Sequence, residues 1–222
     1  VFALKVVHDI IAAVATAPGR AGIGVIRVSG PNLANFSLAL CGRPLPPRVA
    51  TLCTFADSDG SAIDQGIALL FQAPRSYTGE DVLELQGHGG PVLLQHLLRR
   101  CLAVGARVAE PGEFSKRAFL NGKMDLAQAE GVADLIDAAT DQAARAAGRS
   151  INGEFSAAVH AVAGQLLELR ALTEATLDFP EEEIDVGTRQ DQIARLEHIK
   201  TQLARLLMAS DQGSLLREGA VI

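Results

Sequence analysis

The chain has 222 residues, of which 48% are hydrophobic, and this is ample for one large domain or two modest ones. It has no apolar run of about eighteen residues, and Lys5, His8 and Asp9 interrupt its apolar start, which argues against a membrane span or a secretory signal. Its formal net charge of −6 argues against electrostatic binding of nucleic acid by this chain alone, because phosphate binding depends on clustered Lys and Arg. The acidity is local, however, because five of the acids lie at 178–185 and the rest of the chain sums to −1. We therefore expect a cytoplasmic protein that binds no membrane.

Strand and turn signals dominate the first half of the chain. Short apolar runs, separated by Gly and Pro, predict strands at 10–16, 24–29, 64–71 and 81–88. Two helices are expected, one after Pro31 and one after Pro91, since proline is well tolerated in the first turn of a helix. The pattern predicts a mixed sheet covered by helices.

From Gly112 onward the apolar residues recur every three or four positions, as in helices. Asp125 and Gln128 have the spacing of a capping box, and one long helix is expected over about 140–178. A second helical stripe follows at 193–206 and suggests an antiparallel return. An apolar strand is expected to begin at 219–222. The predicted fold is an α+β N-terminal domain, residues 1–120, followed by an all-α domain, residues 121–222.

The three cysteines carry no metal or disulfide signature. Cys41, Cys53 and Cys101 lie far apart, without a CxxC pair and without histidines at ligand spacing. We expect reduced, buried thiols and no metal site. The run at 178–185 holds five acids and no base, and a solvated loop is the favoured interpretation.

Two charged residues stand inside apolar strand patterns. Arg27 lies between Ile26 and Val28, and Glu84 lies between Leu83 and Leu85. A bare charge in such a place is costly unless it is paired or faces a cleft. One interpretation is that the two residues neutralise each other across the sheet.

The other interpretation is a ligand that has both a donor edge and anionic groups. The aminopyrimidone edge of a pterin suits a carboxylate, and the glutamate tail of a folate needs Arg or Lys. Arg27, Glu84 and Lys123 would supply that chemistry. Spacing alone does not choose between the two interpretations.

Nucleotide motifs are absent from the sequence. There is no GxxxxGK[ST] loop, and NGKMD at 121–125 is not a guanine-reading NKxD. We expect no GTP binding or hydrolysis by this chain and no catalytic residue within it. Glu113 and Arg117, four residues apart, are expected to form an ordinary helical ion pair.

Several of these segments together resemble one family over almost the whole chain. They are ATAPGRAGIGVIRVSG, DQGIALLF, SYTGEDVLELQGHGGP, PGEFSKRAFLNGKMDLAQAEGVADLIDA, DFPEEEID and QGSLLREG. In order and spacing they are similar to the MnmE (TrmE) family of tRNA modification GTPases. In that family an N-terminal domain similar to folate-binding aminomethyltransferases precedes a helical domain into which a GTPase domain is inserted.

The resemblance implies a function and a set of partners. Arg27, Glu84 and Lys123 match the folate-contacting positions, so a tetrahydrofolate derivative, 5-formyl or 5,10-methylene, is the implied cofactor. The family dimerises through its N-terminal domain. With MnmG (GidA) it adds a carboxymethylaminomethyl or aminomethyl group to C5 of the tRNA wobble uridine, accompanied by GTP hydrolysis that needs magnesium and potassium.

This chain departs from the family pattern in two places. No GTPase domain follows LLREG, and the C-terminal CxGK motif is missing. GTP, magnesium and potassium are therefore expected only in a full-length protein. Two other functions remain open, namely a purely structural dimerisation or recruiting module and a stand-alone aminomethyltransferase-like enzyme.

Overall fold

The computed structural model describes residues 9–178 and 189–218, and the side chains only as far as residue 210. The chain divides into two compact units, residues 1–124 and 125–222. Each unit is described by itself. The acidic run, apart from Asp178, and the strand expected at 219–222 lie outside the described residues.

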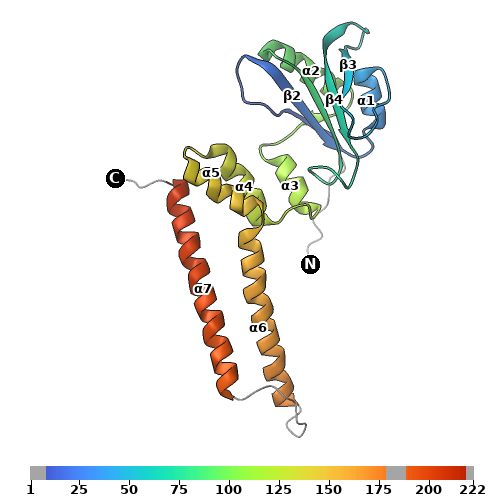
Figure 1. Ribbon diagram of the computed structural model, residues 1–222. Helices are drawn as coiled ribbons and strands as arrows, with labels where there is room; N and C mark the ends of the chain where they lie inside the picture. The colour runs from blue at the N-terminus through green and yellow to red at the C-terminus, as the bar shows by residue number, and fades with distance from the viewer. Residues whose placement is uncertain (1–8, 179–188, 219–222) are drawn as a thin grey trace. The chain divides into compact units, whose positions relative to one another are not determined.

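A mixed sheet forms the first unit, as predicted (Figure 1). Its strands, in the order β3-β4-β5-β2-β1-β6, are β1 (Ile11–Val14), β2 (Ala21–Gly30), β3 (Thr51–Ala56), β4 (Ala62–Phe71), β5 (Asp81–Gly89) and β6 (Arg107–Val108). Neighbouring strands run antiparallel except β1 and β6, which are parallel. Three helices accompany the sheet: α1 (Ala34–Cys41), α2 (Pro91–Ala103) and α3 (Glu113–Leu120).

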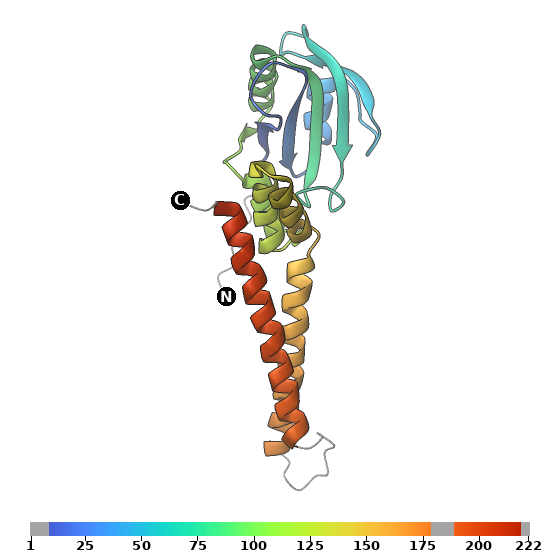
Figure 2. The ribbon, with the colours of Figure 1, turned by 60° about the vertical axis from the view of Figure 1, so that its left-hand side comes forward.

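The hydrophobic core lies between one face of the sheet and helices α1 and α2 (Figures 1 and 2). Strands contribute Ile26, Phe55 and Leu83, all fully buried, and the helices contribute residues such as Leu40 and Leu97. The three cysteines are buried and unpaired, as expected. Burial raises the pKa of the Cys101 thiol to about 12, so it stays protonated.

Strands β3 and β6 do not follow from the apolar pattern of the sequence. In β3 the buried positions are Thr51, Cys53 and Phe55, alternating with exposed neighbours. This is a strand's period of two, but Thr and Cys at inward positions hide it from a search for apolar runs. Strand β6 has only two residues, and it exists because it pairs with β1.

The described residues of the second unit form helices and no strand, as predicted for an all-α domain. Its helices are α4 (Leu126–Asp137), α5 (Asp141–Ile151), α6 (Glu154–Asp178) and α7 (Arg189–Glu218). The expected capping box is present: the Asp125 carboxylate accepts the Gln128 N–H, and the Gln128 side chain accepts the Asp125 N–H. Helices α6 and α7 run side by side as a long antiparallel pair (Figure 2).

The single helix expected over 140–178 is wrong. The structure breaks it into α5 and α6 at Asn152 and Gly153, and Gly153 has φ +79°. That left-handed conformation cannot continue an α-helix, and glycine is the residue that adopts it most readily. The apolar period continues across the break, which is why the sequence pattern did not reveal it.

Across the described ranges, no helix combines the length and apolar character that crossing a membrane requires.

Candidate functional site

Arg27 and Glu84 lie directly opposite each other on neighbouring strands. The register of β2 against β5 pairs Arg27 with Glu84. Both residues are flanked by core side chains, so their own side chains point to the sheet face opposite α1 and α2. Arg27 Nε and Nη2 donate to Glu84 Oε1 at 3.0 and 2.8 Å.

The pair is only partly buried, and it leaves one carboxylate oxygen open. The Arg27 side chain is 31% exposed and the Glu84 side chain 17%. Both hydrogen bonds end on Oε1, and no described residue donates to Oε2. The structural pairing foreseen from the sequence is therefore formed, and Glu84 retains an oxygen that can accept a hydrogen bond from a ligand.

Aromatic rings flank Arg27. Its guanidinium carbon lies 5.2 Å from the centroid of the Tyr77 ring and 6.0 Å from that of Phe114. The Tyr77 hydroxyl is hydrogen-bonded to the hydroxyl of Ser115, the next residue on α3, at 2.9 Å. Such cation–π contacts and the hydroxyl bond hold Arg27 and the two rings in one orientation.

Lys123 lies beside a pocket that also contains Tyr77. The pocket has a volume of about 410 Å³, and its lining residues are Arg48, Phe71, Arg75, Ser76, Tyr77 and Lys123. Lys123 Nζ donates to the carbonyl oxygen of Pro74 at 3.0 Å. Lys123 thus makes no direct contact with the Arg27–Glu84 pair. Tyr77 connects them, because its ring lies beside Arg27 and it lines the same pocket as Lys123.

The turn before β5 brings Lys123 close to that pocket. Gly79 has φ +82°, and a Cβ there would lie 3.0 Å from Asn121 Cβ and 3.2 Å from Lys123 Cγ. Asn121 Nδ2 in turn donates to the Thr78 carbonyl oxygen at 2.7 Å. Glycine is needed at position 79 both for its backbone conformation and for this close approach.

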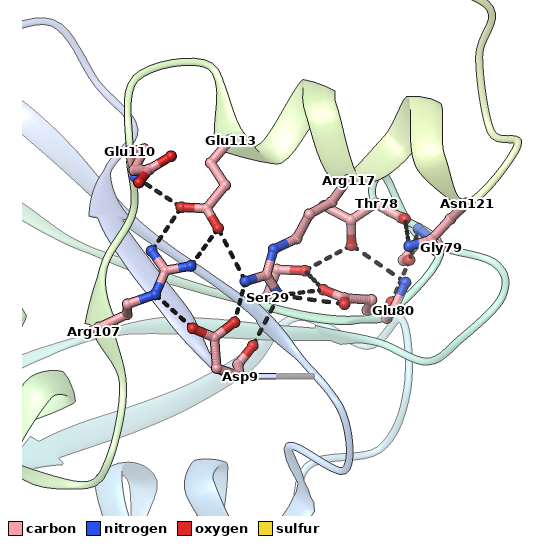
Figure 3. Close-up of polar contacts among 11 residues, drawn as sticks. Asp9, Ser29, Thr78, Gly79, Glu80, Arg107, Glu110, Glu113, Arg117 and Asn121 are labelled. Carbon is pink, nitrogen blue, oxygen red and sulfur yellow. Dashed lines mark hydrogen bonds and ion pairs between the residues drawn. The ribbon is translucent and has the colours of Figure 1, made fainter. Parts of the chain in front are cut away.

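A charge network that is buried at Arg117, Glu80 and Glu113 and partly exposed at Arg107 and Asp9 joins α3 to the sheet (Figure 3). At its centre Arg117, with a side chain only 8% exposed, donates to carboxylate oxygens of Glu80, Asp9 and Glu113. Arg107 donates to Glu113 and to Asp9 as well. The network contains three carboxylates and two guanidinium groups, which is why each member depends on the others.

The arginines shift the carboxyl pKa values in this network. Hydrogen bonds from Arg107, the largest cause, help lower the pKa of Glu113 to about 2, against the opposing effect of burial. For Asp9, burial by itself raises the pKa, but hydrogen bonds from Arg107 and Arg117 outweigh it and the pKa is lowered. Both carboxylates are therefore charged at neutral pH.

The network connects to the loop that carries Tyr77. Glu80 Oε2 accepts a hydrogen bond from the Ser29 hydroxyl at 2.8 Å, and Ser29 is also bonded to the Thr78 hydroxyl at 2.7 Å. Since Phe114 and Ser115 belong to α3, the same network positions the groups around Arg27. It orients the candidate site and does not itself face the pocket.

The sequence identified three residues of this region and missed most of the others. Arg27 and Glu84 are brought together, whereas Lys123 reaches the neighbouring pocket. Glu113 and Arg117 pair on α3 at 3.1 Å, as expected, and both also belong to a larger network that the sequence did not indicate. The missed residues include Asp9, Arg48, Arg75, Tyr77, Glu80, Arg107 and Phe114. Single aromatic or charged residues of this kind, in loops, on α3 or on the two-residue β6, stand in no apolar pattern that would mark them in the sequence. Among the described residues, no cluster of His, Cys, Asp and Glu could hold a metal ion.

Two family models match the chain. The model described as GTP-binding protein TrmE N-terminus matches residues 10–123. The model described as MnmE helical domain matches residues 126–221.

Individual relatives are similar over nearly the whole chain. A tRNA modification GTPase MnmE of Ralstonia nicotianae is 62% identical over 213 residues, which cover 94% of this chain and 45% of the relative. Proteins of the same name from Azoarcus sp. and Neisseria meningitidis are 61% and 59% identical, covering 95% and 94% of this chain and 47% of each relative. The chain thus spans about half the length of these relatives.

Proposed function

The chain belongs to the MnmE (TrmE) family, and from that premise we propose that it is the tetrahydrofolate-binding and dimer-forming part of a cytoplasmic tRNA modification GTPase. In this proposal the complete protein acts with MnmG on C5 of the wobble uridine. GTP, magnesium and potassium serve the complete protein. The chain itself supplies the site for the one-carbon donor.

The folate proposal rests on the hydrogen bonding of the Glu84 carboxylate. Its Oε1 is held by Arg27, and its Oε2 is open on a sheet face that a ligand can reach. The adjacent N–H donors of a pterin would meet Oε2, and the Tyr77 ring beside Arg27 offers a flat apolar surface for a planar ligand.

The three residues then have different roles. Glu84 accepts hydrogen bonds from the pterin. Arg27 fixes the orientation of that carboxylate. Lys123 attracts the anionic end of the folate from the neighbouring pocket, where Pro74 O is its only partner among the described residues.

Exposed apolar side chains support the dimer proposal. Leu52 and Ile67 are cross-strand partners on the sheet face that carries Arg27 and Glu84, and they are 64% and 39% exposed. Ile67 stands opposite Gln86, two residues from Glu84. An apolar patch at this place suits burial against a second copy and would put the folate site beside the interface.

Calorimetric titration with 5-formyltetrahydrofolate tests the folate proposal. Glu84→Ala should weaken binding roughly tenfold to a hundredfold, because the pterin donors lose a charged acceptor, on the order of 1.5–3 kcal/mol. Glu174→Ala on α6, whose exposed carboxylate pairs with Arg170, is the matched control and should leave the affinity unchanged. If folded Glu84→Ala binds folate as tightly as the parent chain, the site assignment is wrong.

A further inference from the structure

Three cations line the pocket beside Tyr77, and no acid lines it. They are Arg48, Arg75 and Lys123, and the rest of the lining is Phe71, Ser76 and Tyr77. By contrast, Arg27, Arg107 and Arg117 of the same unit are all paired with carboxylates. The pocket therefore keeps an excess of positive charge that the described part of the chain does not neutralise.

The partners of these cations are neutral. Lys123 Nζ donates to the carbonyl of Pro74, and Arg48 Nη2 donates to the carbonyl of Arg75. The side chain of Arg75 makes no hydrogen bond or ion pair with a described residue. Carbonyl acceptors orient a cation without cancelling its charge, so the side chains remain able to bind an anion.

Arg48 is held in place at a backbone position that disfavours arginine. Its φ is +61°, a left-handed conformation that suits Gly or Asn better. Its N–H donates to the Leu70 carbonyl oxygen at 2.7 Å, and its guanidinium lies 5.5 Å from the centroid of the Phe71 ring. A residue with a strained backbone and a held side chain, in the lining of a cationic pocket, points to a binding role.

The anion that fits best is a chain of carboxylates. The pocket shares Tyr77 with the Arg27–Glu84 pair, so a ligand whose ring contacts Glu84 can extend its tail past Tyr77 towards the three cations. A folate with one glutamate carries two carboxylates, and each further γ-linked glutamate adds one. An RNA backbone would favour a longer basic surface than three cations around one pocket.

We propose that Arg48 and Arg75, together with Lys123, form a subsite for the polyglutamate tail of the folate and make the protein prefer folates with several glutamates. This inference rests on the proposed folate function. It adds two binding residues and a preference for tail length to that function.

The test compares 5-formyltetrahydrofolate carrying one glutamate with the same compound carrying three. The triglutamate should bind the parent chain about tenfold more tightly, since exposed ion pairs each contribute modestly. That gain should shrink as salt is raised, because salt screens exposed charges. Arg75→Gln and Arg48→Gly should each reduce the tenfold gain of the triglutamate over the monoglutamate, measured within the same variant.

The choice of variants keeps the result interpretable. Arg48→Gly removes the cation and relieves the positive φ, so a loss of the gain cannot be attributed to a strained backbone. Arg99→Gln, an exposed arginine on α2 outside the pocket, is the matched control and should keep the full gain.

The outcomes separate the two proposals. If the parent chain does not bind the monoglutamate at all, the folate function is wrong. If it binds both compounds equally, or if the variants keep the tenfold gain, only the tail subsite is wrong. A parallel titration with a tRNA anticodon stem-loop completes the test, because loss of RNA binding in the variants with an unchanged tail preference would overturn the subsite in favour of a phosphate contact.

Discussion

The two units of this chain bury their apolar and charged side chains very differently. The sheet unit encloses a continuous core between its strands and helices α1 and α2, and it buries ionised groups beneath α3. In the helical unit most of the large apolar side chains that the structure describes are exposed, among them Leu167 at 63% and Leu207 at 58%. Its ion pairs, such as Arg170–Glu174, are also exposed.

The difference indicates that the same residue type contributes very differently to folding stability in the two units. An arginine in the sheet unit is part of a buried network whose carboxylates need it, whereas an arginine on α6 is surrounded by water. The exposed stripes of α6 and α7 suit further packing partners, but helical periodicity does not say which. The predictions that follow use matched pairs of variants to test this contrast.

The largest effect is expected for Arg117→Ala. Removing this guanidinium leaves Asp9 and Glu113 with only Arg107, and it leaves Glu80 without a cationic partner among the described residues. Breaking a mostly buried network in this way costs about 3–5 kcal/mol. Arg170→Ala in the helical unit should cost less than about 1 kcal/mol. Urea unfolding measures both: the single tyrosine, Tyr77, reports the sheet unit by fluorescence, and far-ultraviolet circular dichroism reports chiefly the helices.

The contrast would be broken if Arg117→Ala moved the fluorescence midpoint no further than Arg170→Ala moves the dichroism midpoint. The network would then be an arrangement of charges without consequence for stability. Arg117→Met serves as a second variant, because it keeps the length of the side chain and isolates the loss of charge.

Acidification is expected to lower the stability of the sheet unit by less than Arg117→Ala does. The folded-state pKa of Glu113 is lowered to about 2 from an ordinary value of 4.5, chiefly by hydrogen bonds from Arg107. Its stabilising contribution is therefore fully present above about pH 4.5 and is lost as the pH falls through 2, at a cost of roughly 1.5–3 kcal/mol. The lowered pKa of Asp9 acts in the same direction.

An acid titration followed by both signals checks this expectation. Between pH 4.5 and 2, free energies of unfolding from the fluorescence of Tyr77 should fall more steeply with acid than those from the helical signal. Glu113→Gln should flatten the pH dependence of the fluorescence signal. Equal slopes for the two signals in the parent chain would argue against a special role for the network.

The smallest loss of stability is expected for alanine substitutions at two glycines with positive φ, Gly79 and Gly153. Gly79→Ala in the sheet unit should cost roughly 1–2 kcal/mol, from its left-handed backbone and from crowding against Asn121 Cβ at 3.0 Å. Gly153→Ala between α5 and α6 meets nothing closer than 3.4 Å and should cost only the backbone part, about 1 kcal/mol.

Folate titration sharpens the comparison of the two glycines. Gly79→Ala should also weaken folate binding, because the new methyl group displaces Lys123, while Gly153→Ala should leave it unchanged. If both variants bind folate like the parent chain, the position of Lys123 is unimportant for the ligand.

The sequence alone predicted a good part of this molecule. Strong local patterns were sufficient for β2, β4, β5 and the helices after Pro31 and Pro91, as well as for the capping box at Asp125. They failed where the signal is weak or non-local: at β3, whose inward positions include Thr and Cys, at the two-residue β6, and at Gly153, where one backbone angle ends a helix.

The sequence by itself determined which residues stand out chemically, since a charge within an apolar strand is visible wherever the strand lies. Only the tertiary structure decided what those residues meet. The strand register pairs Arg27 with Glu84, and chain folding brings Arg117 to Asp9, 108 positions away. The same folding gathers Arg48, Arg75 and Lys123 around one pocket. Local patterns carry information about neighbours along the chain, whereas these contacts depend on how strands pair and helices pack, and that is settled by the whole fold.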